Sequence, residues 1–167
     1  MSARHLVPEK LFFTSGVGRH ADHLVSFGMA LRDAGIEHLN LVTVSSIVPP
    51  GCQIIPKAEG IPEFGSGEIT FVVLSRNAID EPDRLISASI GCALPRDTGR
   101  FGYLAEYHVS NKNKDETLEY ACNLAAEMYT TLSDDGATKL TGIARDAVSG
   151  QGWTTVMCAA VFLMLEV

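Results

Sequence analysis

Apolar residues recur every three or four positions in two segments of the chain, the spacing that gives an α-helix one apolar face. The first helix is predicted at residues 22–34, where Leu24, Phe27 and Leu31 share a face, and the second at residues 115–132. A glycine follows each segment within a few residues, as is typical where helices end. The pattern therefore predicts two amphipathic helices, each covering an apolar surface.

The remaining apolar segments have the length of β-strands. They cover residues 11–15, 39–44, 53–55, 69–74, 85–94, 102–109, 140–148 and 156–167. Gly16 and Gly18 are predicted to close the first strand, and the proline- and glycine-rich stretch 49–67 to form a loop. The last strand has no polar face, so we expect both of its faces to be covered. Because the strands do not alternate with helices, we predict an α+β fold of two stacked sheets with outer helices.

Composition and charge exclude several classes of function. The 167 residues suffice for one domain with a sizeable core, and a net charge of -7 without a cluster of lysine or arginine predicts no nucleic-acid partner. The longest apolar run, 156–165, is too short for a membrane-spanning helix, so no membrane association is expected. The four cysteines lack metal-binding spacing, which predicts buried free thiols, no metal site and a cytoplasmic protein.

Two adjacent serines stand where an apolar strand is forced to stop. Ser45 and Ser46 follow the strand at 39–44, and Pro49-Pro50 prevents further pairing. One interpretation is an ordinary turn, in which serine is common. The other is self-cleavage: the Ser46 hydroxyl attacks the Ser45 carbonyl, a donor stabilises the oxyanion, and the resulting ester eliminates to dehydroalanine, which hydrolyses to a pyruvoyl group and ammonia. The residues alone leave both interpretations open.

Short motifs that include the serine pair occur in order along nearly the whole chain. They are Phe27, Ala30-Leu31, Ala34-Gly35-Ile36, Asn40-Leu41, Val44-Ser45-Ser46-Ile47, Pro49-Pro50, Ile55-Pro56, Ile86-Ser87-Ala88, Leu94-Pro95, Gly102, Glu106-Tyr107 and Cys158-Ala159-Ala160. With this set the chain resembles the pyruvoyl-dependent arginine decarboxylases. The stretch Ser-Ser-Ile-x-Pro-Pro is the centre of the resemblance.

The resemblance implies a four-layer αββα sandwich of two mainly antiparallel sheets with outer helices, formed by a single domain, 1–167. It also implies cleavage between Ser45 and Ser46 into a β chain, 1–45, and an α chain, 46–167. The covalent pyruvoyl (pyruvate) cofactor is made from Ser46. Members of the family assemble as trimers or pairs of trimers, so a homotrimer or a dimer of trimers is expected, with active sites between neighbouring subunits.

The activity implied by the resemblance is the decarboxylation of a small-molecule amino acid, L-arginine to agmatine and CO2, through a Schiff base at the residue made from Ser46. Glu106 is implied as the proton donor, and its apolar strand favours a raised carboxyl pKa, although a solvent-facing glutamate fits the same pattern. Asn40 is implied to polarise the Ser45 carbonyl or to orient the pyruvoyl group. A bend is needed for this, because residues 40 and 45 face opposite sides of a strand.

One position departs from the family pattern. The family has an acidic residue on the first helix that helps hold the arginine guanidinium, whereas this chain has Gly28 there, one turn before the substrate-binding position Leu31. Arg32 shares the face of Gly28 and would repel a guanidinium. Three hypotheses stand: an arginine decarboxylase whose neighbouring subunit supplies the acid, a decarboxylase of another amino acid, or a trimer that is never cleaved and is not an enzyme.

Overall fold

Residues 6–137 and 139–164 are described by a computed structural model of the chain. The helices of this part are α1 (His23–Ala34), α2 (Lys57–Gly60), the 3-10 helix η1 (Ile61–Glu63) and α3 (Lys114–Thr130). Its strands are β1 (Lys10–His20), β2 (Asn40–Thr43), β3 (Ile47–Val48), β4 (Gln53–Ile54), β5 (Ile69–Ile79), β6 (Leu85–Leu94), β7 (Gly102–Ser110), β8 (Lys139–Val148) and β9 (Trp153–Leu163). None of the helices described is long and apolar enough to cross a membrane.

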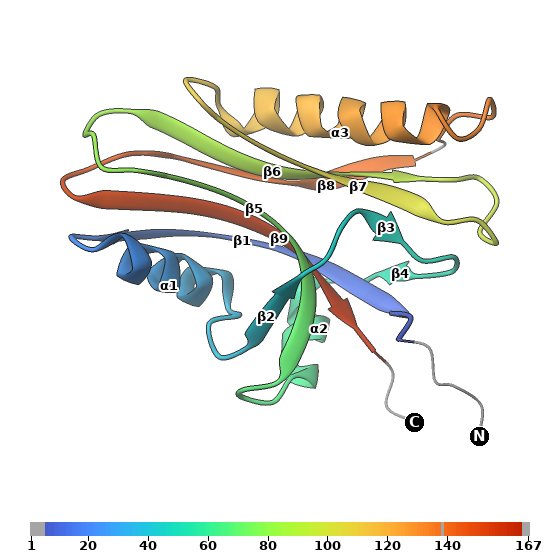
Figure 1. The fold of residues 1–167 in the computed structure, drawn as a ribbon, viewed down its shortest axis with the longest axis horizontal. Coiled ribbons are helices and arrows are strands. Elements are labelled where there is room, and N and C mark those ends of the chain that lie inside the picture. The colour runs from blue at the N-terminus through green and yellow to red at the C-terminus, as the bar shows by residue number, and fades with distance from the viewer. Residues whose placement is uncertain (1–5, 138, 165–167) are drawn as a thin grey trace.

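The strands form two sheets that stack between two helices. One sheet has the order β2-β5-β9-β1-β4 and the other the order β3-β7-β6-β8. Neighbouring strands are antiparallel, except for the parallel pairs of β1 with β4 and β2 with β5. Helix α1 packs on β1 and β9, and α3 packs on β6, β7 and β8, so each helix covers the outer face of one sheet (Figure 1). The predicted αββα sandwich is therefore confirmed.

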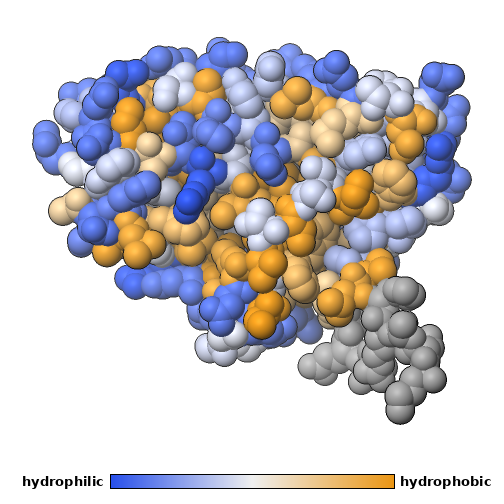
Figure 2. Space-filling view, viewed as in Figure 1, coloured by the Kyte–Doolittle hydropathy of each residue, from blue (hydrophilic) through white to orange (hydrophobic). Residues whose placement is uncertain are grey.

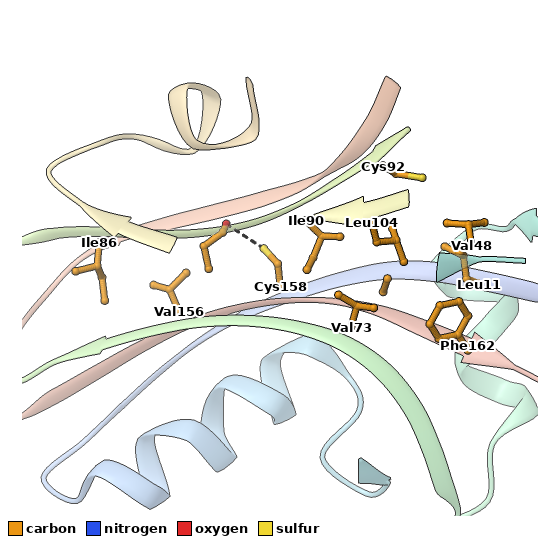
Figure 3. Packing of buried hydrophobic residues seen from close by; sticks show 12 residues of the cluster. Leu11, Val48, Val73, Ile86, Ile90, Cys92, Leu104, Val156, Cys158 and Phe162 are labelled. Carbon is orange, nitrogen blue, oxygen red and sulfur yellow. Dashed lines mark hydrogen bonds between the residues drawn. The ribbon is translucent and has the colours of Figure 1, made fainter. Parts of the chain in front are cut away.

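Strand β9 is buried on both faces, as its sequence predicts. Val156, Cys158 and Phe162 belong to the core between the sheets, together with Ile90 and Leu104 of the other sheet (Figure 3). The alternate residues of β9 join a second apolar cluster under α1: Met157, Ala159, Val161 and Leu163. The strand therefore links the core between the sheets to the layer formed by α1.

Helix α1 packs on β1 through small residues. Its buried residues are Ser26, Ala30 and Ala34. A Cβ atom at Gly16 would lie 2.0 Å from the carbonyl oxygen of Ala30, and one at Gly18 would lie 2.0 Å from that of Ser26. Only glycine permits so close an approach of the helix. Two predictions were therefore wrong: β1 runs straight through both glycines, and the buried face of α1 excludes Leu24, which is 77% exposed.

The other elements differ from their predictions mainly in length. β6 has the predicted bounds, whereas β5 continues five residues beyond 69–74 because it pairs with β9 to its end. β9 begins at Trp153 rather than at residue 156, and its predicted end at 165–167 lies outside the described residues. Helices α2 and η1 lie in the stretch expected to be loop. Asn113 and Glu116 cap α3 with reciprocal hydrogen bonds of 3.0 and 2.9 Å.

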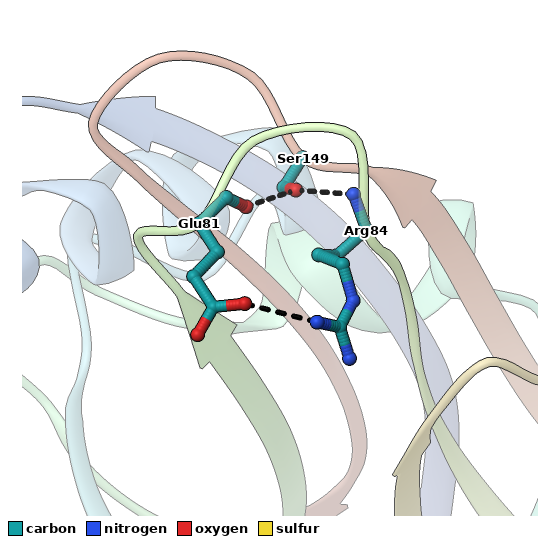
Figure 4. A network of polar contacts seen from close by, with 3 residues as sticks. All are labelled: Glu81, Arg84 and Ser149. Atoms are coloured by element: carbon teal, nitrogen blue, oxygen red, sulfur yellow. Dashed lines mark hydrogen bonds and ion pairs between the residues drawn. The ribbon is translucent and has the colours of Figure 1, made fainter.

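The sheets are also tied together at the end that lies on the left in Figure 1, where β5 turns into β6 and β8 turns into β9. The Ser149 hydroxyl donates to the carbonyl oxygen of Glu81 (2.5 Å) and accepts from the amide of Arg84 (2.9 Å). The guanidinium of Arg84 pairs with the carboxylate of Glu81 at 2.9 Å (Figure 4). These bonds fix the two connections, and so the two sheets, relative to each other.

The cysteines are free thiols, as predicted. Cys92 and Cys158 are buried, whereas Cys52 and Cys122 are only half-buried. Burial raises the pKa of the Cys92 and Cys158 thiols to about 12 and that of Cys52 to about 11. The thiolate is the reactive form, so these cysteines are poor nucleophiles at neutral pH.

Replacing Gly16 by alanine is expected to lower the melting temperature, because the added methyl group overlaps the backbone of α1. Overpacking of this kind costs on the order of 1–3 kcal/mol, occasionally more. Gly28→Ala is the matched control: nothing lies within 4 Å of the added Cβ, and alanine is about 1 kcal/mol better than glycine inside a helix. Circular dichroism should therefore show a lower melting temperature for the first variant only. An unchanged value for Gly16→Ala would contradict the close packing.

Candidate active site

Ser45 and Ser46 lie where the chain crosses from the five-stranded sheet to the four-stranded sheet (Figure 1). Just before the crossover, the amide of Val44 donates to the carbonyl oxygen of Val72 on β5 (2.9 Å). Just after it, the carbonyl oxygen of Ser46 accepts from the amide of Leu104 on β7 (2.7 Å). Within residues 6–137 and 139–164, the backbone of Ser45 makes no hydrogen bond. The Ser45–Ser46 peptide bond therefore spans two anchored points and is itself held by neither sheet.

Ser46 and Glu106 line the same cavity, which has a volume of about 420 Å³. Ser46 enters it from the crossover, and Ala105 and Glu106 enter it from β7. The remaining wall is the C-terminal half of α3 and the residue that caps it: Leu124, Glu127, Met128 and Thr131. The fold thus brings a candidate nucleophile and a candidate proton donor to one cavity across 60 positions of sequence, an arrangement that the resemblance implied and that residue spacing alone does not predict.

The surroundings of Glu106 shift its carboxyl group toward the protonated form. Strand β3 pairs with β7 only at Gly102 and Tyr103, so beyond these residues that edge of β7 is open toward the cavity. Partial burial of the Glu106 carboxyl raises its pKa, and the nearby charge of His108 lowers it by less. The side chain still reaches solvent. The two interpretations drawn from the sequence therefore combine, because the glutamate is both solvent-accessible and shifted toward its protonated form.

Ser45 faces a different cavity from Ser46. This second cavity has a volume of about 470 Å³, and its lining is apolar apart from Ser45 itself. Val44, Ile47 and Phe101 are among the side chains that form it. The two serine side chains are therefore in different environments, and only Ser46 shares a space with ionisable groups.

The other three predicted site residues do not line the Ser46 cavity within one chain. Asn40 begins β2, where its side-chain amide donates to the carbonyl oxygen of Gly67 (2.8 Å). Gly28 lies in the middle of α1, with open space where a side chain would project. Leu31 is partly buried and packs against the apolar cluster beneath that helix. Both helix positions therefore lie on the outer face of the other sheet.

Arg32 does not leave a free cation beside Gly28. Its guanidinium makes a bidentate pair with the carboxylate of Glu37, with N–O distances of 2.7 and 2.8 Å. This pair raises the pKa of Arg32 and lowers that of Glu37, chiefly through the hydrogen bond. The repulsion of a guanidinium expected from the sequence is therefore offset by an adjacent carboxylate.

The chain is similar to known proteins over nearly its whole length. The family described as pyruvoyl-dependent arginine decarboxylase matches residues 10–167. Pyruvoyl-dependent arginine decarboxylase 1 of Methanosarcina acetivorans is 49% identical over 161 residues, which cover 95% of this chain and 98% of that protein. Pyruvoyl-dependent arginine decarboxylase of Methanocella arvoryzae is 53% identical over 162 residues, with the same coverage. A probable pyruvoyl-dependent arginine decarboxylase of Chlorobaculum tepidum is 45% identical over 177 residues, which cover 94% and 98%.

The chain belongs to the pyruvoyl-dependent arginine decarboxylase family. Family membership implies a covalently bound pyruvoyl group, and the crossover fits such a group. Because β2 ends at Thr43 and β3 begins at Ile47, a break between Ser45 and Ser46 interrupts no strand. The backbone carbonyl of residue 46 would stay in the chain and keep its hydrogen bond from the Leu104 amide. The side-chain carbon of residue 46 would face the cavity.

The Glu106 carboxyl of this pyruvoyl-dependent decarboxylase is expected to titrate above the range of an ordinary glutamate, because burial penalises its charged form. His108→Gln should raise the pKa of Glu106 further, since it removes the charge that lowers it. Carbon-13 NMR of side-chain-labelled glutamate measures both values, with an unstructured glutamate peptide as the control. A Glu106 pKa at or below that of the peptide would contradict the assignment.

Proposed function

We propose that this chain is a self-processing enzyme that converts L-arginine to agmatine and CO2 with a pyruvoyl group made from Ser46. The observation that carries the proposal is the shared cavity of Ser46 and Glu106 beside the crossover. Relatives named as arginine decarboxylases support arginine as the substrate, and the pairing of Arg32 with Glu37 weakens the case for another amino acid. The free thiols support a cytoplasmic location.

In the proposed processing step, the Ser46 hydroxyl oxygen attacks the carbonyl carbon of Ser45, and the peptide C–N bond breaks to leave an ester. Elimination then releases Ser45 as a C-terminal carboxylate and leaves residue 46 as dehydroalanine. Hydrolysis of this residue releases ammonia and yields the pyruvoyl group. The β chain, 1–45, would stay bound to the α chain, 46–167, because β1 pairs with β9 along its whole length.

In decarboxylation, a pyruvoyl carbonyl supplies an electron sink. The Leu104 amide holds the backbone of residue 46. Glu106 returns a proton to the substrate carbon after CO2 leaves, and its raised pKa favours the form that can donate. Asn40 polarises the Ser45 carbonyl or orients the pyruvoyl group through its side-chain amide, one hydrogen of which donates to the Gly67 carbonyl in the structure.

We further propose a homotrimer, or a pair of trimers, with active sites between subunits. Large apolar side chains are exposed on α1 and around the crossover: Leu24, Val25, Val42, Val44, Ile47 and Ile69. Figure 2 shows apolar side chains gathered over the centre of one face. Contiguous exposed apolar surface is typical of subunit interfaces. A neighbouring subunit seated on this apolar surface would bring its own Gly28 and Leu31 to a Ser46 cavity. Light scattering of the processed protein measures the mass of the assembly.

Intact-mass measurement tests the processing step. The wild-type protein should give fragments 1–45 and 46–167, and the second should lack an amino group. Ser46→Ala should remain a single 17.9 kDa chain, because the attacking hydroxyl is gone. Ser45→Ala is the matched control: it removes a neighbouring hydroxyl that the chemistry does not use, so cleavage should persist. Cleavage of Ser46→Ala at the same bond would contradict the proposal.

Product analysis tests the substrate. Processed protein should release agmatine and CO2 in equal amounts from arginine, and little amine from lysine, ornithine, histidine or aspartate. Glu106→Gln should still be cleaved but should lower kcat by about 100-fold or more, since general acid catalysis contributes roughly that much. The Ser46→Ala chain sets the background. No agmatine above this background from fully processed wild-type protein would exclude arginine as the substrate.

A further inference from the structure

One stripe of α3 faces the Ser46 cavity. Its members are Leu124, Glu127, Met128 and Thr131, which follow the spacing of neighbours on a single helix face. Glu127 is the charged member of this stripe, and its side chain is exposed. No lysine, arginine or histidine of the described chain pairs with its carboxylate. The cavity therefore contains a carboxylate that makes no ion pair of its own.

The surroundings of Glu127 are suited to a cation. Glu106 also lines the cavity, and the residues that line it include no basic side chain. Glu127 also lies in the last turn of α3, where the helix dipole is negative and stabilises cations rather than carboxylates. Helix stability therefore does not account for a glutamate here, whereas a positively charged ligand would be attracted by the Glu127 carboxylate and by the negative end of the helix dipole.

The substrate of the proposed reaction carries such a cation far from its reacting carbon. Gly28, the position of the acidic residue expected to hold the guanidinium, has no side chain to offer. The carboxylate of Glu37 is already paired with Arg32. We infer that Glu127 binds the guanidinium of arginine and so determines the specificity of this enzyme. This inference rests on the proposed function. With the α-carbon of the substrate placed between residue 46 and Glu106, the substrate side chain would extend along α3 to Glu127.

Comparing arginine with citrulline tests the inference, because citrulline replaces the guanidinium by a neutral ureido group. Glu127→Gln should raise KM for arginine by at least about tenfold, the value of a lost charge-assisted hydrogen bond. Citrulline, measured as substrate or competitive inhibitor, should bind as it does to the wild type. Glu119→Gln is the matched control: Glu119 is an exposed glutamate on α3 that does not line the cavity, so both ligands should behave as with the wild type.

Intact mass is measured first on every variant, because the appearance of fragment 46–167 marks a folded, processed protein. If the processed wild type does not act on arginine, the proposed function fails. If it does act, and Glu127→Gln keeps the wild-type KM for arginine and the wild-type preference over citrulline, then only the role of Glu127 is overturned. An equal loss of affinity for both ligands also overturns it, because that result indicates a steric rather than an electrostatic contact.

Discussion

The segment from Val44 to Ser46 is held by both sheets at once, and the candidate chemistry depends on this constraint. One bond, from the Val44 amide to Val72, belongs to the five-stranded sheet, and the next, from Leu104 to the Ser46 carbonyl, belongs to the other. The two sheets are held relative to each other, because they share an apolar core and are tied by the Glu81–Arg84–Ser149 turns. The peptide bond between the two anchors is the part of the connection that neither sheet stabilises.

The same architecture explains why breaking this bond would leave the fold standing. β1 is paired with β9 over its full length, and α1 rests on β1 so closely that glycine is required at residues 16 and 18. The segment before the break is therefore held by a strand ladder and by a helix interface. The fully buried side of α1 consists of small residues, and the large apolar side chains of Leu24 and Val25 face outward. This arrangement leaves an exposed apolar surface, which the proposed neighbouring subunit would cover.

Most helices and strands lie where the sequence predicts them. The differences fall where packing overrides the local preference of a residue type. The continuous apolar run of β6 predicts a buried strand, and the strand has the predicted bounds. Gly16 and Gly18 favour a turn by residue type, but here they allow the close approach of a helix whose contacting residues lie 8 to 18 positions later in the chain. The candidate nucleophile and proton donor came from the family resemblance. Glu127 could not be predicted, because no spacing in the sequence relates the end of α3 to the crossover.

We propose that the folded crossover, and not the Ser-Ser sequence alone, makes the Ser45–Ser46 bond break. The most direct test isolates freshly made, uncleaved chain in urea, divides it, and dilutes one half into native buffer while the other stays denatured. Mass spectrometry then follows both halves over time. Fragment 46–167 should accumulate only in the refolded half. Equal rates of cleavage in both halves would contradict the claim, because the unfolded chain keeps the serines but loses the bonds from Val44 and Leu104.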